Sequence, residues 1–330
     1  MTGGPVQRAG GANKMAVPDF FIAGPPKAGT TALHSALAGH PELFMSPVKE
    51  PKYYLCDNHP PANTAGPGDA HSAKEWVWRR EDYEALFADA PAGALRGEST
   101  PFYLSDIGAQ ARILMDCPQA RFIVILRDPI DRAYSNWVHL WSDGLEPESD
   151  FVAACALEER RRQAGWAPFW RYRALGLYGQ HLKGLTTLFP NHQVHWLRYR
   201  ELVDEPDLAL NRICDFLGVA SGVVSEVPSA NVSTFVQPTV KNQVLQTAMR
   251  AGASVGRLLP PQVWRTASVP LLKALKDAPA TRPELLPEQR VQLLDYFTDD
   301  VELLESVTGD SFRDWLGESG RGAFTARQSS

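Results

Sequence analysis

Short apolar runs alternate with longer stretches of helical periodicity along most of the chain. Strands are predicted at Phe20–Ala23, Ala94–Glu98, Arg121–Leu126 and His195–Arg198. Helices are predicted at Thr30–Ala38, Ile107–Met115, Arg132–Ser142, Phe151–Ala164, Leu177–Leu188, Pro206–Leu217, Pro287–Thr298 and Asp299–Thr308. Short buried strands separated by helices are typical of a parallel sheet with crossover helices. The pattern therefore predicts an α/β fold with a central parallel sheet flanked by helices.

Four segments depart from this pattern. The two ends, residues 1–17 and 319–330, are aperiodic, and the first is rich in glycine, so both are expected to be disordered. Residues 57–80 and 143–173 interrupt the alternation with clusters of Pro, Gly, Arg and Trp, and are expected to form caps over a site. One domain spanning residues 18–318 is predicted.

Composition and charge exclude several classes of protein. With 330 residues, 44% of them hydrophobic, the chain can bury a sizeable core. The net charge of −5 argues against a general nucleic-acid binder. No leader-like or membrane-spanning apolar run is present, so a cytoplasmic protein with no membrane association is expected. Four widely spaced cysteines match no metal-ligand pattern and are expected to be buried thiols: Cys56, Cys117, Cys155 and Cys214.

The loop after the first predicted strand has the features of an anion site. Phe20 to Leu33 reads FFIAGPPKAGTTAL, in which a helix follows a Pro/Gly loop that carries Lys27, Gly29, Thr30 and Thr31. Unpaired N–H groups and the positive end of the helix dipole favour an anion there. A Walker A loop places lysine after its second glycine, whereas Lys27 precedes Gly29, which disfavours kinases and NTPases.

A second strand-turn-helix segment carries further anion donors. Arg121 to Trp137 reads RFIVILRDPIDRAYSNW, with Arg127 at the end of the strand and Ser135 on the helix. Together with KAGTTAL, this segment resembles the nucleotide-binding motifs of sulfotransferases that use 3′-phosphoadenosine 5′-phosphosulfate (PAPS), including the heparan-sulfate or Golgi type. The resemblance implies a P-loop-like fold and PAPS as cosubstrate. No metal is implied, since neither motif carries an acidic partner for Mg²⁺.

The resemblance also implies roles for these residues. Lys27, Ala28, Gly29, Thr30 and Thr31 would hold the 5′-phosphosulfate, and Lys27 would stabilise the leaving phosphate. Arg127 and Ser135 would hold the 3′-phosphate. The structural alternatives are a surface lysine beside a helix-capping threonine, and an ion pair of Arg127 with Asp128 or Asp131.

A third segment suggests the catalytic base. Ser46 to Tyr54 reads SPVKEPKYY and resembles the family stretch in which a glutamate removes the acceptor proton, which implies Glu50 as the base and Lys52 as a catalytic cation. Glu98 is the reserve candidate for the base. Ser99 stands where relatives that modify glycosaminoglycans have lysine, which puts a polysaccharide acceptor in doubt.

Three further residues are considered for a place at the site. Tyr178 and Lys241 match family positions near the nucleotide and are candidate cofactor-binding residues, with helix packing or a solvated loop as alternatives. His139 is expected to be structural because its neighbours are apolar, with a place in the lining of the acceptor site as the alternative.

The resulting hypothesis is transfer of a sulfonate group from PAPS to a hydroxyl of a small molecule, such as a bacterial natural product. Two alternatives stay open: a P-loop kinase using ATP, and a non-catalytic nucleotide-binding module. The oligomeric state is unknown from the sequence.

Overall fold

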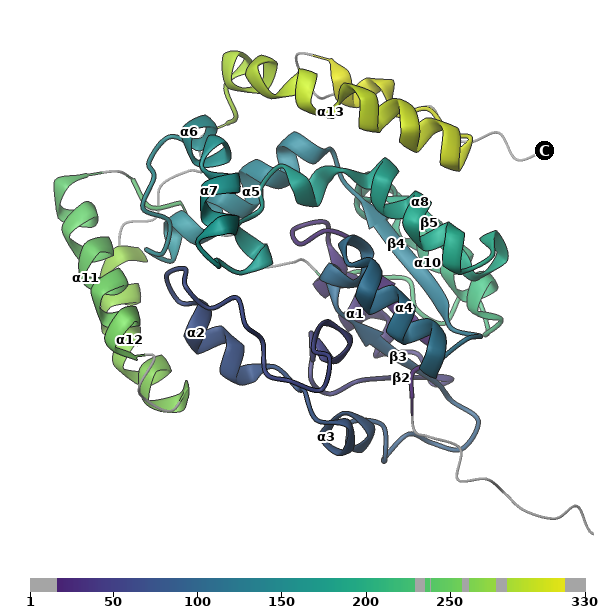
Figure 1. The fold of residues 1–330 in the computed structure, drawn as a ribbon. Helices are drawn as coiled ribbons and strands as arrows, with labels where there is room; N and C mark the ends of the chain where they lie inside the picture. The colour runs from purple at the N-terminus through teal and green to yellow at the C-terminus, as the bar shows by residue number, and fades with distance from the viewer. Residues whose placement is uncertain (1–16, 229–234, 238, 257–260, 277–283, 318–330) are drawn as a thin grey trace, which may run out of the picture.

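The computed structural model describes residues 17–228, 235–237, 239–256, 261–276 and 284–317. A parallel sheet of five strands lies at its centre, in the order β2-β3-β1-β4-β5 (Figure 1). The strands are β1 (Phe20–Ala23), β2 (Leu43–Met45), β3 (Leu95–Ser99), β4 (Arg121–Leu126) and β5 (Val194–Arg198). The predicted parallel α/β fold is confirmed, and the bounds of β1 and β4 are those predicted.

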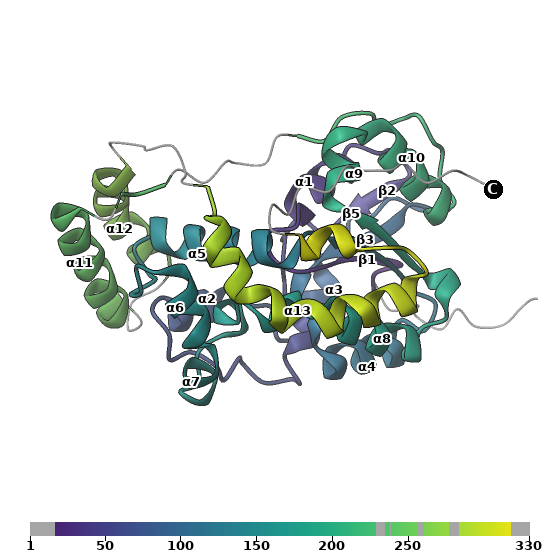
Figure 2. The ribbon, with the colours of Figure 1, turned by 90° about the horizontal axis from the view of Figure 1, so that it is seen from above.

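Helices pack against both faces of the sheet. They are α1 (Thr30–Leu37), α2 (Asp69–Ser72), α3 (Arg80–Ala85), α4 (Ile107–Asp116), α5 (Pro129–Ser142), α6 (Phe151–Ala156), α7 (Glu158–Gln163), α8 (Tyr178–Leu188), α9 (Tyr199–Asp204), α10 (Pro206–Leu217), α11 (Val240–Gly256), α12 (Pro261–Lys276) and α13 (Pro287–Thr308). Seen from above, α13 runs across α5 and α8, while α11 and α12 form a pair at one end of the molecule (Figure 2).

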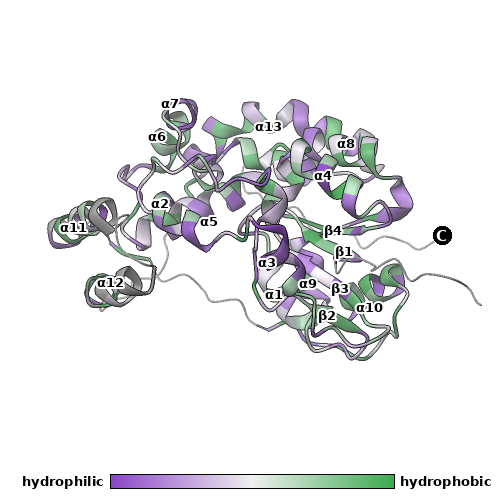
Figure 3. Cartoon of the chain, turned by 60° about the horizontal axis from the view of Figure 1, so that its bottom comes forward, coloured by the Kyte–Doolittle hydropathy of each residue, from purple (hydrophilic) through white to green (hydrophobic). Residues whose placement is uncertain are grey.

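The alternation of side chains along β1 and β4 divides the core into two layers. Phe21 and Phe122 point to one face, where their rings stack 5.4 Å apart against the side that carries α4, α5, α8 and α13. Phe20 and Ile123 point to the other face, which α1, α9 and α10 cover. Both faces are buried, as parallel sheets require. Figure 3 accordingly shows β1 and β4 in the hydrophobic colour and α3 as largely hydrophilic.

Several predicted boundaries are wrong for identifiable reasons. The strand β2 was missed because it has three residues, too few for a periodic signal. The predicted helix Phe151–Ala164 is two helices, and Glu158 turns inward after the break to accept hydrogen bonds from the N–H groups of Arg173 and Ala174.

The last two predicted helices are a single helix, α13. Asp300, inside this helix, accepts hydrogen bonds from the N–H groups of Gly179 and Gln180 at the start of α8. It therefore caps a neighbouring helix rather than ending its own. The sequence patterns also left α2, α3, α9, α11 and α12 unpredicted.

The four cysteines are buried and free of disulfides, as predicted. The expected disordered ends fall almost wholly outside the described residues, at 1–16 and 318–330. Within the described part of the chain, no helix is long and apolar enough to cross a membrane.

Candidate functional site

A cavity of about 630 Å³ lies at the carboxyl edge of the sheet. The loop after β1, the segment after β2, and the residues following β3, β4 and β5 all contribute to its wall. The wall consists of Pro26, Lys27, Gly29, Thr30, Thr31, Glu50, Lys52, Pro67, Gly68, Asp69, Ser72, Trp76, Pro101, Phe102, Arg127, Ser135, His139, Leu140, Asp143, Leu145, Ala167, Pro168, Phe169, Trp170 and Tyr199. Ligands of open α/β sheets bind at this edge, so the cavity is the candidate functional site.

The loop after β1 is shaped by two glycines with positive φ. A Cβ on Gly24 (φ 148°) would lie 2.7 Å from the carbonyl oxygen of Ile125, and one on Gly29 (φ 95°) would lie 2.9 Å from the ring of Tyr199. Gly29 precedes α1, whose first turn has no side-chain cap. The N–H groups of that turn, together with Lys27, therefore make an anion site at the cavity.

The predicted residues of this loop divide into two groups. Lys27, Gly29, Thr30 and Thr31 line the cavity. The side chain of Ala28 is fully buried in the core layer beneath α1, so only its backbone is available to a ligand.

The second anion-binding segment lies directly beside the first. The Nη1 atom of Arg127 donates a hydrogen bond to the carbonyl oxygen of Lys27 (2.9 Å), and the guanidinium lies 5.0 Å from the centre of the Tyr199 ring. Ser135, on α5, lines the same cavity. Lys27, Arg127 and Ser135 thus converge on one volume.

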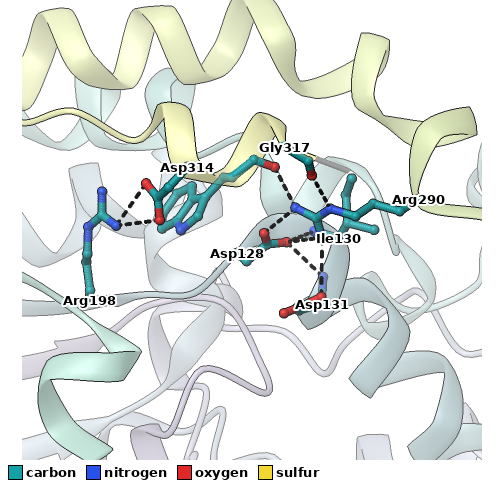
Figure 4. A network of polar contacts seen from close by, with 8 residues as sticks. Asp128, Ile130, Asp131, Arg198, Arg290, Asp314 and Gly317 are labelled. Atoms are coloured by element: carbon teal, nitrogen blue, oxygen red, sulfur yellow. Dashed lines mark hydrogen bonds and ion pairs between the residues drawn. The ribbon is translucent and has the colours of Figure 1, made fainter. Parts of the chain in front are cut away.

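The aspartates considered as structural partners of Arg127 belong to another arginine. Arg290, on α13, pairs with Asp128 (2.5 Å) and with Asp131 (3.3 Å), as Figure 4 shows. Asp128 in turn caps α5 through the N–H groups of Ile130 and Asp131. The buried ion pair with α13 therefore fixes the start of the helix that carries Ser135.

Glu50 lies in the cavity wall between two lysines. Its Oε1 atom is 2.5 Å from the Nζ of Lys49, and its Oε2 atom is 3.7 Å from the Nζ of Lys52. Burial acts to raise the pKa of Glu50, but the two lysines outweigh it and hold the pKa below its usual value. The carboxylate is therefore ionised at neutral pH.

Glu98, the reserve candidate for the base, does not line the cavity. It is fully buried at the end of β3, where it accepts hydrogen bonds from Tyr83 (2.6 Å), Thr100 (2.5 Å) and Tyr103 (3.2 Å). Burial raises the pKa of Glu98 to about 7. Thr100 also accepts a hydrogen bond from the N–H of Lys52 at 3.3 Å. Glu98 is therefore connected through Thr100 to the segment that carries Lys52.

The three candidate catalytic residues share an unusual backbone conformation. Lys27, Glu50 and Lys52 have φ values of 71°, 58° and 62°, in the left-handed region. Non-glycine residues rarely adopt it, and such strain concentrates at functional sites. Nothing in the sequence pattern indicated this conformation.

Two predicted cofactor residues are not brought to the cavity. Tyr178 is buried on α8, with its ring 5.9 Å from that of Trp315 and edge-on to it. Lys241 is exposed near the start of α11. Neither belongs to the cavity wall, and binding of the cofactor by Tyr178 and Lys241 stays a prediction.

Other wall residues lie outside the set of predicted site residues. His139 lines the cavity, which was the alternative to a structural role. Tyr199 immediately follows β5, and its place at a strand's carboxyl end was a usable signal. Trp76 belongs to segment 57–80, which was expected to cap the site, whereas Phe102 and Phe169 gave no such signal.

The two cap segments meet through Asp69. Its carboxylate accepts hydrogen bonds from the indole of Trp170 (2.8 Å) and from the N–H groups of Ala167 (2.8 Å) and Gly66 (2.9 Å). Both segments contribute to the cavity wall. Asp69 therefore joins the two caps at the cavity.

Among the described residues, no group of three or more His, Cys, Asp or Glu side chains is arranged to hold a metal ion. The charged groups on the wall suit an organic anion with separated negative charges.

The chain is similar in sequence to known sulfotransferases. The sequence model of the sulfotransferase family matches residues 18–221. The mouse heparan sulfate glucosamine 3-O-sulfotransferase 3B1 is 30% identical over 210 residues, which cover 63% of this chain and 48% of the relative. The human bifunctional heparan sulfate N-deacetylase/N-sulfotransferase 2 is 26% identical over 210 residues, covering 62% of this chain and 22% of the relative.

A solved structure is similar over nearly the whole chain. The crystal structure of a sulfotransferase from Alicyclobacillus acidocaldarius aligns with a TM-score of 0.70 and 27% identity, and covers 91% of this chain and 98% of that one. By contrast, the chain spans about half the length of the heparan sulfate 3-O-sulfotransferases it matches.

Proposed function

The chain belongs to the sulfotransferase family, and from its cavity we propose that it transfers a sulfonate group from PAPS to a hydroxyl of a small-molecule acceptor. One observation carries the proposal: Arg127 donates to the backbone of Lys27, so two anion-binding segments face one cavity that also contains Glu50. A carrier with a phosphosulfate at one end and a phosphate at the other fits that arrangement.

The residues take distinct roles in the proposed reaction. Lys27, Thr30, Thr31 and the first-turn N–H groups of α1 hold the phosphosulfate, and Arg127 and Ser135 hold the 3′-phosphate. Glu50 accepts the proton of the acceptor hydroxyl as its oxygen bonds to sulfur. The bond from sulfur to the phosphate oxygen breaks, and 3′-phosphoadenosine 5′-phosphate (PAP) leaves with the electron pair, stabilised by Lys27.

The position of Glu50 supports it, rather than Glu98, as the base. Glu50 is on the cavity wall with an ionised carboxylate, and 30% of its side chain is accessible. A base must reach the proton that it removes. Glu98 is fully buried and is already bonded to three hydroxyl groups.

We also propose a cytoplasmic enzyme that acts on a small metabolite, such as a natural product. Its cysteines are four buried free thiols, and thiols persist in a reducing compartment. Incubation of cell-extract metabolites with PAPS and enzyme should yield a product heavier by one sulfonate.

Ligand-induced stabilisation tests the nucleotide. PAP should raise the melting temperature, and ATP with Mg²⁺ should not. Lys27→Ala should lower kcat for sulfonate transfer about 10²- to 10³-fold, the usual effect of removing one donor to a developing charge. Lys183→Ala is the matched control, because Lys183 is exposed on α8 outside the cavity wall. Stabilisation by ATP alone would favour the kinase alternative, and PAP binding without transfer to any acceptor would favour the non-catalytic one.

A further inference from the structure

The part of the cavity beyond Glu50 has an aromatic wall, formed by Trp76, Phe102, Phe169 and His139. The rings of Phe102 and Phe169 are 6.3 Å apart and edge-on, and Phe169 meets His139 edge-on at 5.8 Å. Leu140, Leu145 and Pro168 complete this part of the lining. An apolar, aromatic surface of this kind favours a flat apolar ligand.

The aromatic wall begins at the candidate catalytic residues. The ammonium of Lys52 lies 5.0 Å from the centre of the Trp76 ring and 5.8 Å from that of Phe102. The same ammonium is 3.7 Å from the carboxylate of Glu50. A ring resting on the aromatic wall can therefore bring a substituent to both Lys52 and Glu50.

Charge on the wall disfavours an anionic acceptor. The Lys and Arg residues on the cavity wall are Lys27, Lys52 and Arg127, all of them at the cofactor and base positions. The described residues lining the remainder include the acids Asp69 and Asp143 but no Lys or Arg. A sulfated or carboxylated saccharide would find no Lys or Arg there to neutralise its charges.

We propose that the acceptor is an uncharged phenol, whose ring lies on the aromatic wall and whose hydroxyl reaches Glu50 and Lys52. This inference rests on the proposed sulfonate transfer and specifies its substrate class.

The chemistry of Glu50 agrees with such an acceptor. Its lysine neighbours lower the pKa of Glu50 and so make it a weak base. A phenol ionises near pH 10, as tyrosine does, whereas an alkyl hydroxyl ionises far less readily. Lys52 beside the hydroxyl would stabilise the phenolate as its oxygen bonds to sulfur, while the proton passes to Glu50 and PAP departs.

Two isomers of one formula test the proposal. The enzyme is incubated with PAPS and either 4-ethylphenol or 2-phenylethanol, and both PAP release and the mass gain of one sulfonate are measured. The kcat/KM for 4-ethylphenol should exceed that for 2-phenylethanol at least tenfold. It should also exceed that for 4-hydroxyphenylacetate, which adds a carboxylate, and that for a heparan-type oligosaccharide.

The position of the ring is tested by a matched pair of tryptophans. Trp76 lines the cavity, whereas Trp78, two residues on, stacks with Arg79 at 4.8 Å outside the wall, and both are half-buried. Trp76→Ala should raise KM for 4-ethylphenol about tenfold and leave the affinity for PAP unchanged. Trp78→Ala should change neither.

Specific outcomes would overturn the phenol assignment. Equal or faster sulfonation of 2-phenylethanol or the oligosaccharide would do so, as would failure of the enzyme to sulfonate 4-ethylphenol while PAP still raises its melting temperature. Loss of that PAP stabilisation would instead overturn the proposed function itself.

Discussion

The Nη1 atom of Arg127 donates a hydrogen bond to the carbonyl oxygen of Lys27 across 2.9 Å, although 100 residues separate the two positions in the chain. The contact joins the residues that follow β1 and β4, which are neighbours in the sheet. Each residue belongs to one of the two anion-binding segments. The relative position of those segments is thus set by the pairing of two buried strands, which makes the cavity rigid where the cofactor is proposed to bind.

Removal of the Arg127 side chain should weaken cofactor binding. We expect Arg127→Ala to raise the dissociation constant of PAP about 10- to 100-fold, because hydrogen bonds to a charged group contribute about 1.5–3 kcal/mol. Isothermal titration calorimetry measures the change. Arg162→Ala is the control, since Arg162 pairs with Glu159 on the exposed surface of α7. Equal affinity in the wild type and Arg127→Ala would contradict the assigned role.

Glu50 should set the acidic limb of the pH–rate profile. The base must be ionised, so kcat/KM falls as the pH drops through its pKa, which the two lysines hold below the ordinary value of 4.5. Lys49→Met removes one of those charges and should move the limb to higher pH, whereas Lys49→Arg should not. Glu50→Gln should lower kcat about 10²- to 10⁴-fold. A limb that Lys49→Met leaves in place would show that another group is the base.

Glu98 should make the folded state less stable as the pH rises. Its pKa is about 7 in the folded protein and near 4.5 when exposed, so between these values the folded state binds more protons than the unfolded state. Raising the pH from 5 to 8.5 should therefore remove about 3 kcal/mol of stability through this group. Glu98→Gln should lack that component, as urea unfolding at both pH values would measure. Parallel pH dependence in the two proteins would contradict the pKa.

Arg290 should contribute strongly to stability. Arg290→Ala leaves the buried carboxylate of Asp128 without its partner and should lower the free energy of unfolding by about 3–5 kcal/mol. Arg313→Ala should stay within about 0.5 kcal/mol of the wild type, because 81% of that side chain is exposed. Urea denaturation compares the two. Similar losses would mean that the buried pair is not specifically stabilising.

The sequence predicted correctly those elements of the fold that have a strong local pattern. The bounds of β1 and β4 were predicted because both are continuous apolar runs, and the loops that follow them carry distinctive residues at short spacing. The loop pattern pointed to Lys27, and the resemblance to sulfotransferase motifs pointed to Arg127 and Ser135; all three line one cavity. Their proposed roles await the experiments above.

Contacts between residues far apart in the chain could not be predicted from the sequence. Arg290 reaches Asp128 across 162 positions, and no local pattern marks either residue as the other's partner. The aromatic wall has the same origin, because four separate segments supply one residue each. Asp69 was likewise not singled out, although its carboxylate joins the two caps.

The left-handed backbone at Lys27, Glu50 and Lys52 sets a limit for engineering. Glycine or asparagine would relax the chain at each of these positions, so a library selected only for thermal tolerance would tend to accumulate them there. Such variants would become more robust while losing the ammonium and carboxylate groups that the proposed reaction needs. Selection for durability should therefore keep these three codons fixed, or it will steadily enrich well-folded proteins that no longer turn over substrate.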